Sequence, residues 1–152
     1  MTYSTIHQIW SNKPLPNQFR DWSQSWRDNH KDWKYKLWDD EECNKLIEKE
    51  YAWFLPTYNN YKFPIQRYDA ARYFILYHYG GLYVDMDIWC KKNTNKLFNY
   101  DTDCILFDEY PINPLDNKIK LLTNSIMYSP PKSKFFRIVT KSLEAAYKEE
   151  KY

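Results

Sequence analysis

Two aspartates, Asp85 and Asp87, follow a short apolar segment and give this sequence its clearest chemical signal. Side chains two residues apart on a strand point to the same face, so a strand ending here would bring both carboxylates together. Adjacent anions repel each other unless a cation lies between or beside them. Mn²⁺ and Mg²⁺ prefer oxygen ligands, so the pair predicts a divalent-metal site with Asp85 and Asp87 as ligands. The alternative is that both carboxylates are simply solvated at the end of a strand.

A largely apolar segment precedes this strand and predicts a buried helix over residues 66–79, which Gly80 and Gly81 would end. Asp69 and Arg72 are charged residues within this segment. Three residues apart on a helix, they are neighbours and can form an ion pair, which would offset much of the cost of burying them. They can also face a ligand, with Arg72 directed to anionic oxygens and Asp69 to hydroxyl groups. The two interpretations are compatible.

The segment from Asp69-x-x-Arg72 through Gly80-Gly81-Leu82-Tyr83-Val84-Asp85-x-Asp87 resembles the sugar-binding region containing the DXD motif of glycosyltransferase family 32. It is also similar to the glucosylating clostridial toxins. Ile6-His7-Gln8-Ile9-Trp10 resembles the family's first strand, and Lys36-Leu37-Trp38-Asp39-Asp40 resembles its second. An Asp-x-Asp motif alone is common, but three motifs in the family's order are specific. The resemblance covers residues 5–140 and is closest through Asp87.

The resemblance implies an α/β protein of the A-type glycosyltransferase fold, a Rossmann-like, open, mainly parallel sheet flanked by helices. It also implies a metal-dependent enzyme that moves a hexose or N-acetylhexosamine from a UDP- or GDP-sugar. The acceptor would be a glycan, a protein or a lipid-linked molecule, and the transfer would retain the anomeric configuration. A catalytically weak module that only binds a nucleotide sugar is the alternative.

Roles for individual residues follow from the same resemblance. Asp87 would hold Mn²⁺ or Mg²⁺ directly, and Asp85 would contact ribose or the donor sugar and reach the metal through water. These two carboxylates are therefore the candidate catalytic residues, and no nucleophile is assigned. A divalent cation at this position would stabilise the departing diphosphate as a Lewis acid.

The remaining candidates would bind the donor substrate. Asp69 and Arg72 would contact hydroxyl groups of the donor sugar, Tyr83 would line the same pocket, and Trp10 would stack on or flank the nucleotide base. For Trp10 and Tyr83, plain packing in the hydrophobic core is an equally good interpretation, because aromatic residues serve both purposes.

Length and composition agree with one folded domain over residues 1–152. The chain is 43% hydrophobic with only two glycines, enough to form a real core. Its formal net charge of +2 gives no electrostatic footprint for nucleic acid, so no nucleic-acid partner is expected.

The three cysteines, Cys43, Cys90 and Cys104, have no C-x-x-C spacing and are odd in number, which disfavours a zinc site and a disulfide framework. They fit a reducing compartment, and neither a secretory leader nor an apolar run of membrane-spanning length is present. We therefore expect a cytoplasmic protein, in the host cytoplasm or virion if viral, with peripheral membrane association left open. A composition rich in Lys, Asn and Tyr suggests a virus or bacterium.

Hydrophobic periodicity predicts alternating strands and helices. We expect strands at residues 5–10, 33–37, 82–84, 104–107 and 125–128, and helices at 16–29, 39–51, 66–79 and from about 135. Asp39 and Asp40 would cap the second helix, Ser133 would cap the last, and residues 56–64 would form a loop.

Members of family 32 usually continue well past the last of these helices, and the later region supplies further metal or diphosphate contacts. Two explanations stay open: the chain is C-terminally incomplete, or it is a minimal form whose pocket is completed across a homodimer interface. A phosphohydrolase using the same carboxylates ranks lowest, because the additional acidic or histidine ligands of two-metal hydrolytic sites are missing.

Overall fold

The structure is a computed structural model, and it describes residues 4–11, 13–98, 104–108 and 121–149. The strands are β1 (Thr5–Ile9), β2 (Lys34–Trp38), β3 (Gly81–Val84), β4 (Ile105–Asp108) and β5 (Leu122–Ser129). The helices are α1 (Asn17–Asn29), α2 (Asp40–Glu50), α3 (Leu55–Asn60), α4 (Pro64–Tyr79), α5 (Lys134–Glu149) and the short 3-10 helix η1 (Asn95–Leu97).

The strands form one five-stranded sheet in the order β2-β1-β3-β5-β4. β1 is parallel to both β2 and β3, whereas β5 is antiparallel to β3 and to β4. Among these strands only β5 therefore runs in the opposite direction, and the prediction of an open, mainly parallel α/β sheet is confirmed. In such sheets, ligands bind beyond the carboxyl ends of the parallel strands.

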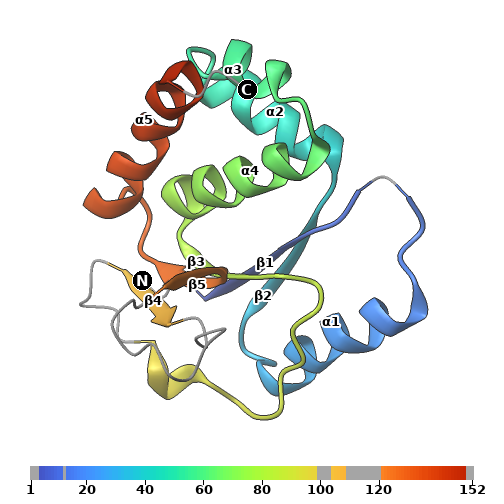
Figure 1. Ribbon diagram of the computed structural model, residues 1–152. Coiled ribbons are helices and arrows are strands. Elements are labelled where there is room, and N and C mark those ends of the chain that lie inside the picture. The colour runs from blue at the N-terminus through green and yellow to red at the C-terminus, as the bar shows by residue number, and fades with distance from the viewer. Residues whose placement is uncertain (1–3, 12, 99–103, 109–120, 150–152) are drawn as a thin grey trace, which may run out of the picture.

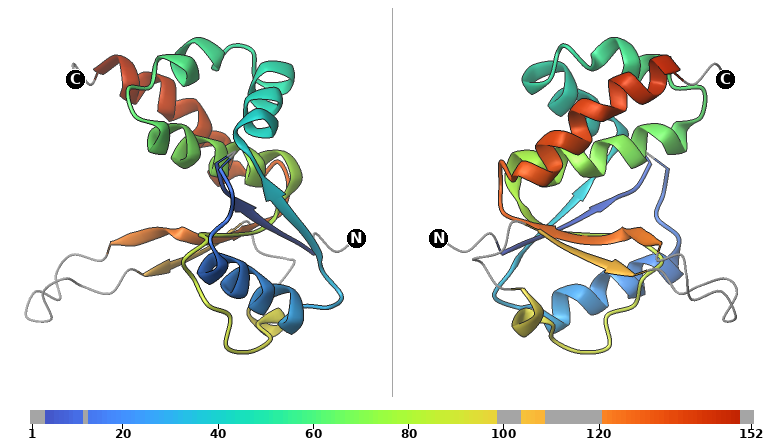
Figure 2. Two further views of the ribbon diagram at one scale, coloured as in Figure 1. Left: turned by 90° about the vertical axis from the view of Figure 1, so that its right-hand side faces the viewer. Right: turned by 60° about the vertical axis from the view of Figure 1, so that its left-hand side comes forward.

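Helices cover both faces of the sheet and form a three-layered arrangement (Figures 1 and 2). Helices α2, α3, α4 and α5 lie over one face, and α1 with η1 lies under the other (Figure 1). Each face has its own hydrophobic cluster. The larger cluster includes Ile47, Phe54, Phe74 and Phe136, and the smaller one includes Trp26 of α1 with Leu82 and Val84 of β3.

The helix caps predicted at Asp39 and Ser133 are confirmed, whereas Asp40 is the first residue of α2 and not its cap. The Asp39 side chain accepts a hydrogen bond from the backbone N–H of Glu42 at 2.8 Å, and the Glu42 side chain accepts one from the backbone N–H of Asp39. This reciprocal capping box fixes the start of α2 directly after β2. At α5, the Ser133 hydroxyl accepts from the backbone N–H of Phe136 at 3.2 Å.

One predicted loop is wrong, because residues 55–60 form helix α3. The polar composition of this segment and its bounding prolines indicated a loop, yet a proline is well tolerated in the first turn of a helix. Thr57 and Tyr58 are buried, and the Tyr58 ring packs near Phe54. Tertiary packing therefore outweighs the weak local propensity.

The turn between α4 and β3 depends on its two glycines, which have φ angles of +67° and +99°. A Cβ atom on Gly80 would lie 2.6 Å from Pro131, and one on Gly81 would collide with the backbone oxygen of Thr5 in β1. Glycine allows both the positive φ angles and the close approach. The turn thereby sets α4 directly against β3, the strand that leads to the two aspartates.

His7 joins three elements at the base of this turn. Its Nε2–H donates to the backbone oxygen of Gly80 at 2.9 Å, and its Nδ1 accepts from Trp38 Nε1–H at 3.1 Å. The imidazole is only 2% exposed, and this burial lowers its pKa from 6.5 to about 4. The ring is therefore neutral at pH 7 and holds β1, β2 and the α4–β3 turn together.

Among the described residues, no helix is both long and apolar enough to cross a membrane.

We expect the buried His7 to make stability fall in mild acid. Because the folded-state pKa lies below the unfolded value, the unfolded chain binds one more proton between about pH 6.5 and pH 4, so unfolding becomes easier as pH falls. The free energy of unfolding, measured by urea denaturation, should drop by about 3 kcal/mol more in the native chain than in His7→Gln over this window. Equal pH dependence in both proteins would contradict this role.

Candidate functional site

The two aspartates lie just beyond the end of β3, which stops at Val84. The backbone N–H of Asp85 still donates to Ser125 of β5 at 2.7 Å, and the chain then turns, with the N–H of Ile88 donating to the oxygen of Asp85. The aspartates are therefore placed by a turn rather than by strand alternation. Even so, Asp85 and Asp87 line the same cavity, as their spacing predicts.

Arg72 lies at the centre of this site and is 4% exposed. Its guanidinium is 2.8 Å from the Asp69 carboxylate on the same helix and 3.3 Å from the Asp85 carboxylate beyond β3. It also donates to the backbone oxygen of Asn124 in β5 at 3.0 Å. The predicted pair within the helix is present, but it belongs to a larger arrangement in which one cation holds two carboxylates.

Tyr83 packs against Arg72 and orients Asp85. The guanidinium lies 4.8 Å from the centre of the Tyr83 ring, which is a favourable cation–π geometry. The Tyr83 hydroxyl donates to the Asp85 carboxylate at 2.7 Å. Burial raises the pKa of Tyr83 well above its usual value of 10, so the phenol stays protonated and remains a donor.

Opposing effects act on the Asp85 carboxyl group. Burial raises its pKa above 3.8, while Arg72 and the Tyr83 hydroxyl act to lower it, and the nearby Asp87 raises it further. The two carboxylates therefore interact, as the sequence suggests. Asp85 is held by protein partners, whereas Asp87 is exposed. The two acids consequently have different local environments.

A cavity of about 350 Å³ opens at the carboxyl ends of β1 and β3. It contains five of the six predicted site residues: Trp10, Arg72, Tyr83, Asp85 and Asp87. Asp69 does not line it, but its carboxylate holds Arg72 in place. Trp10 packs against Phe19 of α1, with ring centres 4.9 Å apart, and its indole N–H donates to the backbone oxygen of Lys13.

The carboxylates of Asp85 and Asp87 fit a divalent cation whose other ligands come from a bound substrate. Within the described ranges, no group of three or more His, Cys, Asp or Glu side chains could enclose a metal ion. Mg²⁺ and similar ions are commonly held by one or two carboxylates together with phosphate oxygens of the substrate. The exposed Asp87 carboxylate, with Asp85 two residues before it, provides such an incomplete ligand set.

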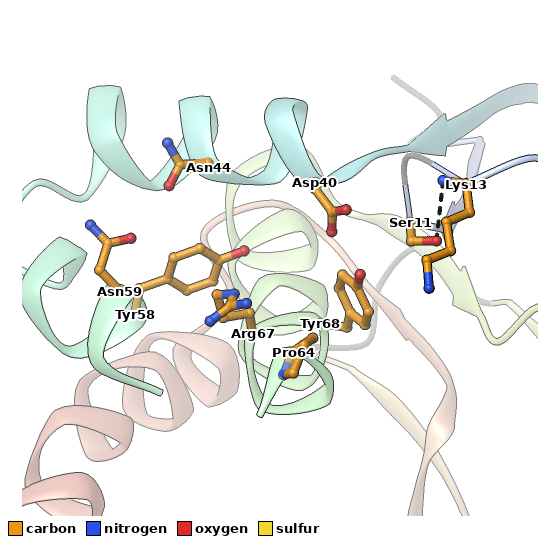
Figure 3. A pocket seen from close by; sticks show the side chains of 9 residues that line it. All are labelled: Ser11, Lys13, Asp40, Asn44, Tyr58, Asn59, Pro64, Arg67 and Tyr68. Carbon is orange, nitrogen blue, oxygen red and sulfur yellow. Dashed lines mark hydrogen bonds between the residues drawn. The ribbon is translucent and has the colours of Figure 1, made fainter. Parts of the chain in front are cut away.

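A second, larger cavity of about 720 Å³ adjoins the first, and Ser11 and Tyr68 line both. Its remaining walls come from α2, α3, the start of α4 and Lys13 after β1 (Figure 3). This cavity is not predicted from the sequence, because a cap role accounts for Asp40 and the polar composition of residues 56–64 indicates a loop rather than a helical wall. The sequence signal for this cavity is the neighbouring pair Arg67 and Tyr68, because a charged and an aromatic side chain side by side can indicate a ligand site.

The arrangement defines a class of protein: an α/β protein of the A-type glycosyltransferase fold, with acidic residues beyond a central strand. The chain matches the family "Glycosyltransferase sugar-binding region containing DXD motif" over residues 16–103 and belongs to this family, glycosyltransferase family 32. The resemblance inferred from Asp69, Arg72, Asp85 and Asp87 is thereby confirmed. A structural comparison agrees, with a TM-score of 0.67 to PaToxG Glycosyltransferase at 13% identity, covering 97% of this chain and 62% of that one.

Several curated relatives are fungal mannosyltransferases. Mannosyl phosphorylinositol ceramide synthase SUR1 of Saccharomyces cerevisiae is 39% identical over 139 residues, covering 91% of this chain and 34% of that protein. Inositol phosphoceramide mannosyltransferase 1 of Schizosaccharomyces pombe is 43% identical over 100 residues, covering 64% of this chain and 31% of that protein. The chain thus spans about a third of the length of these relatives.

The cytoplasmic location expected from the cysteines is contradicted by these relatives. They are named for acting on inositol phosphoceramide, a lipid whose hydrocarbon chains hold it in a membrane. The number and spacing of the cysteines do not indicate the compartment, because Cys43 and Cys90 are buried and a buried thiol packs as a small apolar group in any compartment. The curated relatives are mostly fungal, so a viral or bacterial origin stays a prediction.

We expect Tyr83→Phe to test how Asp85 is held. The substitution keeps the ring over Arg72 but removes the 2.7 Å hydrogen bond to the carboxylate. The free energy of unfolding, from urea denaturation, should fall by about 1–2 kcal/mol, because a hydrogen bond to a charged group is lost. Tyr79→Phe is a matched control on a half-exposed ring and should change stability by less than about 0.5 kcal/mol. Equal effects of the two substitutions would contradict the assigned role.

Proposed function

We propose that this chain forms the donor-binding core of a metal-dependent glycosyltransferase that moves mannose from a nucleotide diphosphate sugar to a lipid acceptor. The observation that carries the proposal is the cavity at the carboxyl ends of β1 and β3. There Arg72, Tyr83 and Asp85 form one hydrogen-bonded unit, and the exposed carboxylate of Asp87 lies on the same cavity. Ligand sites of open α/β sheets lie at this edge.

The choice of sugar and acceptor rests on the relatives. The two yeast proteins described above are named for mannosylating inositol phosphoceramide. We transfer mannose and an inositol phosphoceramide acceptor to this chain from those names. The chain spans about a third of these proteins, and in this proposal the acceptor site of the relatives extends beyond the matched region.

In the proposed donor complex, Arg72 binds sugar hydroxyls, and Asp85 contacts the ribose or the sugar. Asp69 is predicted from the sequence to contact the sugar as well, but it does not line the cavity, so its role in this proposal is to hold Arg72 in place. Arg72 suits this role because its guanidinium is buried and fixed by three partners, so little conformational entropy is lost when a ligand binds. Trp10 lines this cavity at the end of β1, next to Ser11, and flanks the bound nucleotide there.

Asp87 would hold a Mn²⁺ or Mg²⁺ ion, with Asp85 in support through water. When bound, such an ion supplies Lewis-acid stabilisation of the departing diphosphate. The protein's own contribution is to keep Asp87 exposed at the cavity while Arg72 and Tyr83 hold Asp85.

A second candidate is a catalytically weak module that binds a nucleotide sugar without transferring it. It is compatible with the described residues, among which no group of three or more His, Cys, Asp or Glu side chains could hold a metal ion without a substrate. This module would use the same donor pocket, so both candidates predict binding and only the first predicts transfer.

Calorimetric titration of UDP- and GDP-mannose, with and without Mn²⁺, tests the donor site. We expect binding of one donor to require the metal and to weaken at least about tenfold in Asp87→Asn, because the direct carboxylate ligand is lost. Asp32→Asn, a charge-matched change at an exposed position, should bind like the native chain.

The proposal fails if the folded native chain binds neither donor at any metal concentration. Metal-dependent binding without transfer to inositol phosphoceramide would support the binding module over the transferase.

A further inference from the structure

The two adjoining cavities differ in character. The smaller one, of about 350 Å³, holds Arg72, Asp85 and Asp87 and is large enough for a sugar and part of a diphosphate. A nucleotide diphosphate sugar also carries a ribose and a base, which need further space. The 720 Å³ cavity begins where the smaller one ends, at Ser11 and Tyr68.

The larger cavity presents a carboxylate and a guanidinium among aromatic rings. Figure 3 shows Asp40 of α2 beside Tyr68 of α4, with Tyr58 and Arg67 further along the same hollow. One guanidinium nitrogen of Arg67 donates to the backbone oxygen of Tyr61 at 3.2 Å, which anchors the side chain at the wall.

Asp40 is held in position by its neighbour. The Tyr68 hydroxyl is hydrogen-bonded to the Asp40 carboxylate, and its pKa is raised to about 12, by burial first and by Asp40 second. The phenol therefore stays protonated and donates to the acid at neutral pH. A carboxylate accepts about four hydrogen bonds, so one carboxylate can accept from Tyr68 and from a ligand at the same time.

This set of groups matches guanine. The base presents two adjacent donors, N1–H and the N2 amino group, which a single carboxylate can accept together. Its O6 and N7 atoms are acceptors, and arginine is their commonest partner. Uracil offers one N–H between two carbonyl oxygens, so a carboxylate facing it would meet two repelling acceptors. Tyrosine rings such as those of Tyr58 and Tyr68 provide stacking surfaces for a base.

We propose that the larger cavity holds the nucleotide base and that Asp40 makes the site specific for guanine over uracil. This inference rests on the proposed function and narrows the donor to a GDP-sugar. Arg67 contacts the acceptor edge of the base, and Ser11 and Tyr68 mark the passage toward the sugar-binding cavity.

The phosphorylated headgroup of an acceptor lipid is the competing occupant. Lys13 and Arg67 would favour its phosphate. Asp40 opposes it, because an oriented carboxylate on the cavity wall repels a phosphate anion. Guanine uses the carboxylate, the guanidinium and the rings together, so it accounts for more of the lining.

Equilibrium binding of GDP and UDP in the presence of Mn²⁺ tests the proposal on the native chain, Asp40→Asn and Glu41→Gln. Glu41 is the neighbouring acid on α2, is exposed and pairs with Lys45, so it is a charge-matched control. We expect the native chain and Glu41→Gln to prefer GDP at least about tenfold. Asp40→Asn should lose that preference by weakening GDP at least about tenfold, with UDP little changed.

Xanthosine diphosphate provides a gain-of-binding control. Xanthine has a carbonyl oxygen where guanine has the N2 amino group, so the amide of Asp40→Asn can donate to it. We expect this variant to bind xanthosine diphosphate more tightly than the native chain does, a result that a merely misfolded variant cannot give.

Each other outcome decides against the proposal. If the native chain binds both nucleotides without preferring GDP, or if Asp40→Asn weakens GDP and UDP alike, the base assignment is wrong while the donor site stands. If neither nucleotide binds the folded native chain, the proposed function itself fails and the base assignment fails with it. Inhibition of GDP binding by inositol phosphate that is lost in Arg67→Gln but unchanged in Asp40→Asn would assign the cavity to the headgroup instead.

Discussion

The buried guanidinium of Arg72 is the constraint on which the rest of the site depends. Breaking a buried pair leaves a charge unpaired at high cost, so the partners of Arg72 must stay in place. Those partners come from α4, the turn after β3, and β5. One cation thereby fixes the position of Asp85 and ties together the three segments that surround the proposed donor pocket.

The fold supplies what this arrangement requires. Gly80 and Gly81 let α4 turn back directly into β3, and His7 fastens that turn to β1. The helix carrying Arg72 therefore packs against the strand that leads to Asp85. The capping box of Asp39 and Glu42 starts α2 at the end of β2, which places Asp40 at the same edge of the sheet.

Much of this organisation could be predicted from the sequence, because it follows from local patterns. The Gly-Gly turn, the cap at Asp39 and the grouping of Asp85 with Asp87 each depend on residues close in the chain. What could not be predicted depends on distant residues. The contact between Arg72 and Asp85 spans 13 residues, and helix α3 forms because packing overrides its polar composition. The second cavity requires three helices to be placed in space before it exists.

The most direct test of this account is a crystal structure of the chain with Mn²⁺ and a non-hydrolysable nucleotide sugar. We expect the metal on the Asp87 carboxylate at an oxygen-ligand distance of about 2.0–2.3 Å, with the diphosphate completing its coordination. We also expect that Arg72 keeps its contact with Asp85 and reaches the sugar. A nucleotide sugar bound away from the Arg72 cavity, or a metal bound without Asp87, would contradict the account.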